Sequence, residues 1–292
     1  MYFFGNESRE IYRRIKIRTF EQGTIMSSYF DNKVIWITGA SSGIGEALVK
    51  ELTLNTNAKI ILSSRKEEQL YAVAENTGLT HSRYAVLPLD LAHYKSMPDM
   101  AGKAIEKFGK IDILINNAGL SQRSLAMETD IEIDKHLMEV DYLGTVALTK
   151  AVVPYMIRNG GGQIAVVSSL MGIFGAPMRS GYAAAKHALH GFFDALRAEL
   201  YNQNILVTII CPGFIQTNIS IHALTGDGSL QGTMDDATEK GMPADVFAKK
   251  MLYAIEKKKN QKAIGGKEVM GVYLKRFFPA LLAKVIRKAK VV

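Results

Sequence analysis

The chain has 292 residues, of which 48% are hydrophobic and 22% charged, a composition that excludes a disordered, collagen-like or low-complexity protein. Its single cysteine, Cys211, excludes a disulfide framework and a cysteine-based zinc cluster, and it fits a reducing compartment. The formal net charge of +8 divides into +2 for residues 1–30, −4 for 31–244 and +10 for 245–292, so the body is not basic and we expect no nucleic-acid partner.

Residues 1–30 do not share the regular pattern that follows, and we expect them to form a disordered extension. Met26 reads like a natural start just before the first strand, in which case the preceding 25 residues come from an upstream start codon. The alternative is a basic amphipathic anchor that includes Ile11 and Ile15.

From residue 33 onward, short apolar runs alternate with helical patterns, and neither a repeat nor a linker divides residues 31–265. The predicted strands are 34–37, 59–62, 84–89, 111–115, 163–167 and 205–210, and the predicted helices between them are 44–52, 67–75, 97–108, 131–158 and 180–201. Because the strands lack polar alternation, both of their faces should be buried under helices. With right-handed crossovers, the expected fold class is α/β: one domain with a doubly wound, Rossmann-like parallel sheet.

Residues 213–242 interrupt this alternation and are predicted to form a substrate lid, because a long irregular segment beside a strand end usually covers a site. An ordinary surface excursion is the alternative. A helix over 243–259 and a last strand at 263–264 should complete the domain.

Residues 266–292 are predicted to form a basic amphipathic tail, in which Pro279 divides any helix. Such a segment suits the boundary of an anionic bilayer, whereas no run approaches the roughly 18 apolar residues of a membrane span. We therefore expect a cytoplasmic protein with peripheral membrane contact through this tail. The alternative is that the apolar face of the tail packs on the lid or on a neighbouring subunit.

A glycine-rich turn, Thr38–Gly45, lies between the first predicted strand and helix and has the spacing G-x-x-x-G-x-G. A dinucleotide pyrophosphate needs backbone N–H groups at a helix N-terminus without side chains in the way. The residues predicted to hold it are Gly39, Ser41, Ser42, Gly43, Ile44 and Gly45. A purely structural turn is the alternative.

Ser64 and Arg65 follow the second predicted strand, where an acidic residue would bind a ribose 2′-hydroxyl and an arginine would accommodate a 2′-phosphate. Because no carboxylate lies between the second predicted strand and Glu67, the sequence favours NADP(H) over NAD(H). Asp90, after the third strand, is expected to reach the adenine, with Leu91 beside it.

Tyr182 and Lys186 are four positions apart on a predicted helix and therefore share a face. A tyrosine titrates near 10, so acid–base work near neutral pH needs a pKa lowered by about three, worth roughly 4 kcal/mol. A nearby ammonium favours the phenolate and supplies that change. Ser169, just past the fifth strand, can hold a reacting carbonyl oxygen beside Tyr182.

Together these motifs resemble the compact branch of the short-chain dehydrogenase/reductase family. They are T-G-A-S-S-G-I-G (38–45), N-N-A-G (116–119), S-S (168–169), Y-A-A-A-K (182–186) and P-G-F-I-Q-T (212–217). The resemblance implies an oxidoreductase that transfers hydride between a nicotinamide and a carbonyl or alcohol carbon, as a homodimer or homotetramer. It also implies cofactor contacts from Tyr182, Lys186, Asn117, Ala118, Gly119, Pro212, Gly213, Ile215 and Thr217.

Residues 117–124, 174–182 and 218–229 further resemble the dehydrogenase/reductase member seven-like subgroup. Its relatives include reductases of acyl-dihydroxyacetone phosphate and of steroid- or retinoid-like ketones, which implies an apolar ketone or keto-lipid substrate. The apolar residues before Tyr182 either line that pocket or pack locally; they are Met171, Ile173, Phe174 and Met178. Arg123 and Arg179 either hold a substrate phosphate or are solvated or salt-bridged.

Asp141 departs from the family, which commonly has asparagine there to support a water beside the active-site lysine. An ionised aspartate donates no hydrogen bond. Its charge near Lys186 would favour the ammonium but oppose the Tyr182 phenolate, so we assign Asp141 to the catalytic group as a modifier of proton transfer.

Two other functions remain open from the sequence. The first is a catalytically weak NADP(H)-binding sensor or scaffold, which only Asp141 supports. The second is a nucleotide-sugar epimerase or dehydratase, which the glycine spacing and the lack of a large C-terminal substrate domain disfavour. No metal site is expected.

Overall fold

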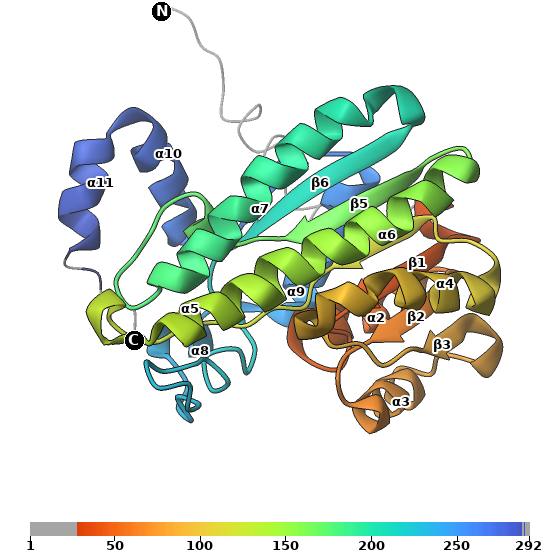
Figure 1. Ribbon diagram of the computed structural model, residues 1–292, viewed down its shortest axis with the longest axis horizontal. Helices are drawn as coiled ribbons and strands as arrows, with labels where there is room; N and C mark the ends of the chain where they lie inside the picture. The colour runs from red at the N-terminus through yellow and green to blue at the C-terminus, as the bar shows by residue number, and fades with distance from the viewer. Residues whose placement is uncertain (1–27, 288, 290–292) are drawn as a thin grey trace, which may run out of the picture.

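Seven parallel strands form the centre of the structure, a computed structural model that describes residues 28–287 and 289 (Figure 1). The strands are β1 (Val34–Thr38), β2 (Lys59–Ser63), β3 (Tyr84–Val86), β4 (Ile113–Asn116), β5 (Gly162–Val167), β6 (Ile205–Pro212) and β9 (Gln261–Ile264). Their order is β3-β2-β1-β4-β5-β6-β9, so the chain reverses direction across the sheet after β3. The predicted doubly wound α/β domain is therefore confirmed, and the last predicted strand is β9, beside β6.

Two layers of helices bury the sheet, because alternate residues of each strand point to opposite faces. In β1, Ile35 and Ile37 enter one core, whereas Val34 and Trp36 enter the other. The first core is covered by α2 (Gly43–Asn55), α3 (Glu67–Asn76) and α9 (Ala244–Glu256), and the second by α4 (Met97–Phe108), α6 (Thr145–Arg158) and α7 (Ser180–Glu199).

Two predicted elements differ in detail. The third strand ends at Val86 rather than at residue 89, because Pro88 has no N–H to continue the ladder, although Leu89 N–H still donates to the Ser64 carbonyl at 2.9 Å. The long helix predicted over 131–158 consists of α5 (Ile131–Leu137), a π-helical segment at Met138–Gly144, and α6. This wider turn contains Asp141.

The packed chain begins before the predicted boundary at residue 31. Phe30 is fully buried in the first core, and the Tyr29 hydroxyl donates to Gln163 Oε1 at 2.6 Å. Residues 1–27, and with them both interpretations of the N-terminal extension, lie outside the described residues.

Residues 213–242, the lid segment, are mostly irregular but contain more structure than we expected. A two-residue strand, β7 (Ile215–Gln216), pairs with β8 (Met242–Pro243), and one short helix, α8 (Asp236–Glu239), precedes β8. The lid segment thus leaves the sheet at the end of β6 and returns to the start of α9.

The basic tail forms a helical hairpin at one end of the molecule, made of α10 (Met270–Phe277) and α11 (Pro279–Ile286) (Figure 1). Pro279 begins α11, as predicted for the point of division. Leu282 is buried in the second core, and the partly buried Val272, Leu274 and Ile286 pack against that core. No helix in the described part of the chain is long and apolar enough to cross a bilayer.

Candidate active site

The glycine-rich turn connects β1 to the N-terminus of α2 in a form that only glycine fits. Gly39 has a φ of +66°, and a Cβ there would lie 2.9 Å from the Ala118 Cα. A Cβ on Gly45 would collide with the Gly39 carbonyl. The Ser42 hydroxyl makes no capping bond to α2. Backbone can therefore approach a ligand closely at this helix terminus.

Thr38 and Asn117 tie this turn to the end of β4. The Thr38 hydroxyl oxygen accepts from the N–H groups of Asn117 and Ala118 at 3.0 and 3.1 Å, and Asn117 Nδ2 donates to the carbonyls of Thr38 and Gly39 at 3.0 and 3.2 Å. The Asn117 amide thus supports the turn directly. Thr38 was absent from our predicted site residues, although it belongs to the turn motif.

The residues predicted around the adenosine follow β2 and β3. Ser64 is half-buried and Arg65 is exposed. The Asp90 carboxylate accepts from the Ala92 N–H at 3.0 Å, and so caps the short helical turn that begins at the buried Leu91. The structure therefore gives Asp90 a capping role at this turn, and its contact with an adenine stays a prediction.

Ser169 follows the end of β5, and Tyr182 and Lys186 lie in the first two turns of α7. All three are at least nine-tenths buried. Lys186 Nζ donates to the Val167 carbonyl at 3.2 Å and lies 5.7 Å from the centre of the Tyr182 ring. Ser169 Oγ accepts from the Met171 N–H at 3.1 Å. The ammonium is thus fixed beneath the tyrosine ring at the end of the sheet.

Asp141 reaches the same place from the π-helical segment. Its Oδ2 lies 3.4 Å from Lys186 Nζ, and its Oδ1 accepts from the Leu120 N–H at 2.7 Å. Complete burial raises the pKa of Asp141, and the Lys186 charge opposes that rise only in part. A Cβ on Gly119 would lie 3.0 Å from both Asp141 Oδ1 and Lys186 Nζ. Gly119 therefore allows this ion pair to form.

The predicted nicotinamide segment, 212–217, continues from β6. Gly213 N–H donates to the Ile264 carbonyl at 2.8 Å, and Ile215 is buried. A Cβ on Gly43 would lie 3.0 Å from Thr217 Cγ2, so the segment runs beside the glycine-rich turn. Glu268, which the sequence did not single out, accepts at Oε1 from the Phe214 N–H at 3.1 Å.

The apolar residues before Tyr182 pack at least partly on the tail. Phe174 is buried, and its ring leaves no room for a Cβ on Gly271 of α10. Met171 and Ile173 are half-buried against the second core. Met178 has a φ of +63°. Local packing therefore accounts for Phe174.

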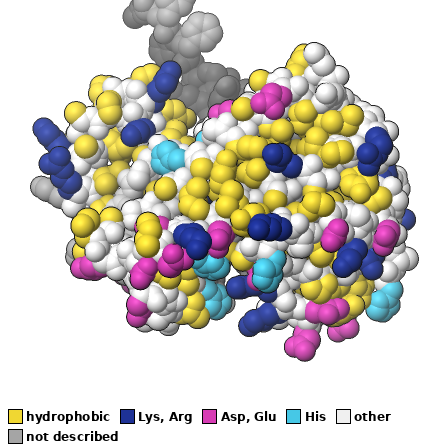
Figure 2. Space-filling model, in the orientation of Figure 1, with side chains coloured by type: hydrophobic (Ala, Val, Ile, Leu, Met, Phe, Trp, Pro, Cys, Tyr) yellow, Lys and Arg dark blue, Asp and Glu magenta, His cyan; other side chains and the backbone are white. Residues whose placement is uncertain are grey.

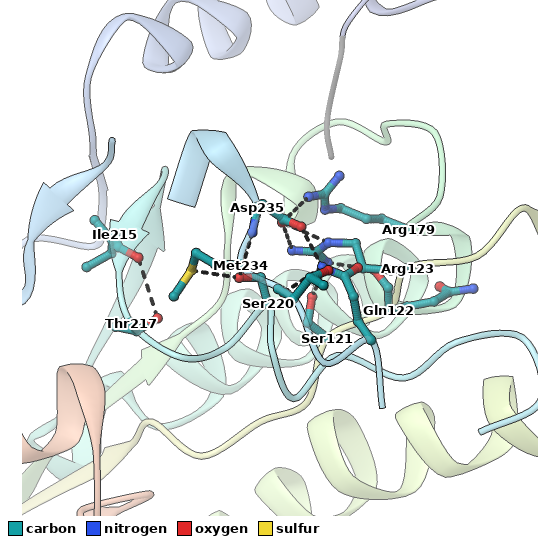
Figure 3. Close-up of polar contacts among 11 residues, drawn as sticks. Ser121, Gln122, Arg123, Arg179, Ile215, Thr217, Ser220, Met234 and Asp235 are labelled. Atoms are coloured by element: carbon teal, nitrogen blue, oxygen red, sulfur yellow. Dashed lines mark hydrogen bonds and ion pairs between the residues drawn. The ribbon is translucent and has the colours of Figure 1, made fainter. Parts of the chain in front are cut away.

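Arg123 and Arg179 both contact the carboxylate of Asp235, which belongs to the lid segment (Figure 3). Arg123 donates to Asp235 Oδ2 through Nε, at 2.9 Å, and through Nη2, and Arg179 Nη2 lies 3.3 Å from the same oxygen. All three residues are buried. The salt-bridged alternative for Arg123 and Arg179 is confirmed. Asp235 gave no signal in the sequence.

The charges of this cluster influence one another. Burial alone would raise the pKa of Asp235, but hydrogen bonds from Arg123 and Gln231 outweigh burial and hold it below the usual value. Burial, and then the neighbouring Arg123, lower the pKa of Arg179 to about 10. The lid carboxylate thus remains ionised over most of the pH scale.

Comparison with known proteins gives one consistent result. A family profile described as short chain dehydrogenase matches residues 33–226. The chain is 39% identical to the dehydrogenase/reductase SDR family protein 7-like of Drosophila melanogaster over 89% of its length and 81% of that protein. It is 38% identical to dehydrogenase/reductase SDR family member 7B of Bos taurus, over 89% of this chain and 82% of that protein.

Solved structures share the fold. A short chain dehydrogenase/reductase from Burkholderia phymatum in complex with NAD is 22% identical, with a TM-score of 0.76 over 87% of this chain and 96% of that one. An alcohol dehydrogenase from Thermococcus sibiricus complexed with 5-hydroxy-NADP is 24% identical, with a TM-score of 0.68 over 80% of this chain and 97% of that one.

Proposed function

The chain belongs to the short-chain dehydrogenase family of oxidoreductases, and from that premise we propose that it uses NADP(H) to interconvert a carbonyl and an alcohol on an apolar substrate. The observation that carries the proposal is the burial of Ser169, just after β5, and of Tyr182 and Lys186, on α7. A bound nicotinamide would donate or accept the hydride.

In this proposal Tyr182 gives a proton to the carbonyl oxygen, or takes one from the alcohol. Lys186 favours the phenolate through its charge, because its ammonium lies 5.7 Å from the centre of the ring. The Ser169 hydroxyl orients the reacting oxygen. Asp141, 3.4 Å from Lys186, partly offsets that charge.

The preference for NADP(H) rests on residues after β2. The glycine-rich turn would hold the pyrophosphate at the start of α2. Exposure of Arg65 just after β2, with no carboxylate between the end of β2 and Glu67, supports binding of a 2′-phosphate there. The remaining proposed cofactor contacts come from two segments beside this turn. Asn117, Ala118 and Gly119 follow β4, where the N–H groups of Asn117 and Ala118 donate to Thr38. Pro212, Gly213, Ile215 and Thr217 belong to the segment at the end of β6, where Thr217 lies beside Gly43.

Two interaction surfaces belong to the same proposal. Apolar side chains extend across the face formed by α6 and α7 (Figure 2), which supports a homodimer or homotetramer in the manner the family resemblance implies. On the tail hairpin, apolar side chains that are at least half exposed include Phe277, Phe278, Tyr273 and Met270. With the exposed cations of α10 and α11, they support contact of a cytoplasmic enzyme with an anionic membrane surface.

A substrate panel tests the activity. NADPH oxidation is followed with steroid, keto-acyl and acyl-dihydroxyacetone-phosphate ketones, and NADPH binding is measured separately. We expect turnover with at least one apolar ketone, and its loss in Tyr182→Phe with NADPH binding retained. NADPH binding without turnover on any member of the panel would instead support a sensor or scaffold.

A further inference from the structure

The helix that carries Tyr182 begins without a cap of its own. The N–H groups in the first turn of an α-helix have no partner within the helix. At the start of α7 the residue in the capping position, Arg179, makes no side-chain capping bond. A partner from elsewhere in the fold is therefore needed at the turn where Tyr182 lies.

Gln122 provides that partner from far away in the sequence. Its Oε1 accepts from the N–H groups of Gly181 and Tyr182 at 2.8 and 3.2 Å. The Gln122 side chain is completely buried. One of the two hydrogen bonds that Oε1 accepts thus comes from the backbone N–H of the proposed acid–base residue itself.

The opposite end of the amide is also held. Nε2 donates to Thr129 Oγ1 at 2.9 Å and to Ser124 Oγ at 3.2 Å. Because the two backbone N–H groups can only donate, they require the amide oxygen to face α7, and the hydroxyls at the other end can accept from the amide nitrogen. The Gln122 side chain therefore has a single place in which all these bonds form.

The backbone on both sides of Gln122 is fixed as well. Leu224 of the lid segment donates to the Ser121 carbonyl at 2.8 Å, and its own carbonyl accepts from the Arg123 N–H at 2.8 Å. Ser124 N–H donates to the Met178 carbonyl at 3.2 Å, just before α7. Figure 3 shows Gln122 beside the arginine cluster.

We propose that Gln122 is a positioning residue that sets the place of Tyr182 relative to Lys186 and Ser169, an inference that rests on the proposed function. Lys186 is fixed at its charged end by the Val167 carbonyl and Asp141. Tyr182 lies one turn earlier, where a helix without a cap frays. Loss of the Gln122 bonds would displace the tyrosine while the lysine stays in place.

The test compares Gln122→Met with Gln122→Glu. Methionine keeps the volume but makes none of the hydrogen bonds to α7, which are those to the N–H groups of Gly181 and Tyr182 and, at 3.4 Å, from Nε2 to the Ser180 hydroxyl. We expect kcat to fall about tenfold or more while KM for NADPH stays within about threefold. Glutamate keeps an acceptor for both N–H groups, and the hydroxyls of Ser124 and Thr129 can turn to donate to it. We expect Gln122→Glu to recover at least half of the loss on a logarithmic scale.

Gln163→Met is the matched control. Gln163 is another buried glutamine, and its Nε2 donates to the Ile255 carbonyl at 2.9 Å near the opposite end of β5 from Ser169. We expect this variant to lose stability but to keep kcat within about twofold. If Gln122→Met does not fold, Thr129→Val, which weakens the other end of the amide, should lower kcat by a smaller factor with KM for NADPH unchanged.

The outcomes separate the two proposals. An active native chain whose kcat is unaffected by Gln122→Met, or falls equally in Gln163→Met, overturns the role of Gln122 alone. A rise in KM for NADPH that matches the fall in kcat also overturns it. A native chain that turns over no substrate overturns the proposed function, and the positioning role falls with it.

Discussion

Asp141 places a negative charge beside Lys186, the residue that we propose assists proton transfer by Tyr182. Lys186 would favour the phenolate by its charge, but a carboxylate 3.4 Å away weakens that effect. Because burial raises the pKa of Asp141, the carboxylate is easier to neutralise than an ordinary aspartate. In the proposed mechanism, the protonation state of Asp141 therefore decides how far the charge of Lys186 is offset.

Asp141→Asn should change the pH dependence of turnover without abolishing it. Asparagine has no charge at any pH, so the part of the profile that depends on ionisation of Asp141 should disappear, with kcat changed by about tenfold at most. The measurement is kcat against pH for both chains. Superimposable profiles would show that the substitution is neutral.

The same substitution also has a predicted effect on stability. The folded pKa of Asp141 lies above its usual value of 3.8, so its stabilising effect is complete below that value and is lost as pH rises through the folded pKa. The free energy of unfolding of the native chain, relative to Asp141→Asn, should therefore decrease from acid to neutral pH. An increasing difference in denaturant titrations would contradict this sign.

Arg65 is the residue on which cofactor choice should depend. Arg65→Ala should weaken NADPH binding by about tenfold or more and change NADH binding by less than about twofold, because only NADPH carries the 2′-phosphate. Lys66→Ala, an exposed cation one position further on, is the control and should affect both cofactors weakly. Equal affinities of the native chain for NADPH and NADH would rule out the preference.

At the scale of whole elements, the tail hairpin has one face packed on the enzyme and one face in solvent. Leu282 is 5% exposed, whereas Phe277 and Phe278 are 67% and 62% exposed. The apolar residues of the first face pack on the second core, and contact of the second face with a membrane stays a prediction. The packed face lies against Phe174, which links the hairpin to the segment between Ser169 and Tyr182.

The exposed face can be tested without removing the packed one. Phe277→Ser combined with Phe278→Ser should reduce flotation with anionic vesicles at low salt several-fold, since two aromatic anchors are lost. The melting temperature should be nearly unchanged, because both side chains are exposed. A native chain that stays in the soluble fraction would exclude membrane contact, and a change of oligomer size would assign this face to a subunit interface.

Elements with a local signal were predictable from the sequence. The buried runs of isoleucine and valine gave the strands, and the glycine-rich turn gave the start of α2. The π-helical segment was not predictable, because one extra residue in a turn hardly alters the apolar pattern of a helix. Gln122 and Asp235 were missed because their partners are distant in sequence: Asp235 meets Arg123 across 112 positions.

At the scale of the whole molecule, the ion cluster of Arg123, Arg179 and Asp235 connects the lid segment to the segments on either side of the proposed active site. The carboxylate of Asp235 comes from the lid, and the two arginines from the body. Since removal of one partner from a buried ion pair leaves an uncompensated charge, the lid should depend strongly on this carboxylate.

Asp235→Asn should therefore loosen the lid. We expect faster proteolysis within residues 213–242 and a rise of about tenfold or more in KM for the substrate, with NADPH affinity little changed. Asp236→Asn, an exposed neighbour that contacts Lys240, is the control. Unchanged proteolysis in Asp235→Asn would mean that the other contacts of the lid hold it alone.

The order of the strands also bears on self-association during synthesis. After β3, the strands β4, β5, β6 and β9 join in chain order at one growing edge, so each incomplete sheet presents an unpaired apolar strand. The finished edges are unattractive templates: β3 has three residues and is followed by Pro88, and β9 exposes Gln261 and Lys262. A chain that stopped short of β9 would instead present β6, with Ile209 and Cys211 at an aggregation-prone border.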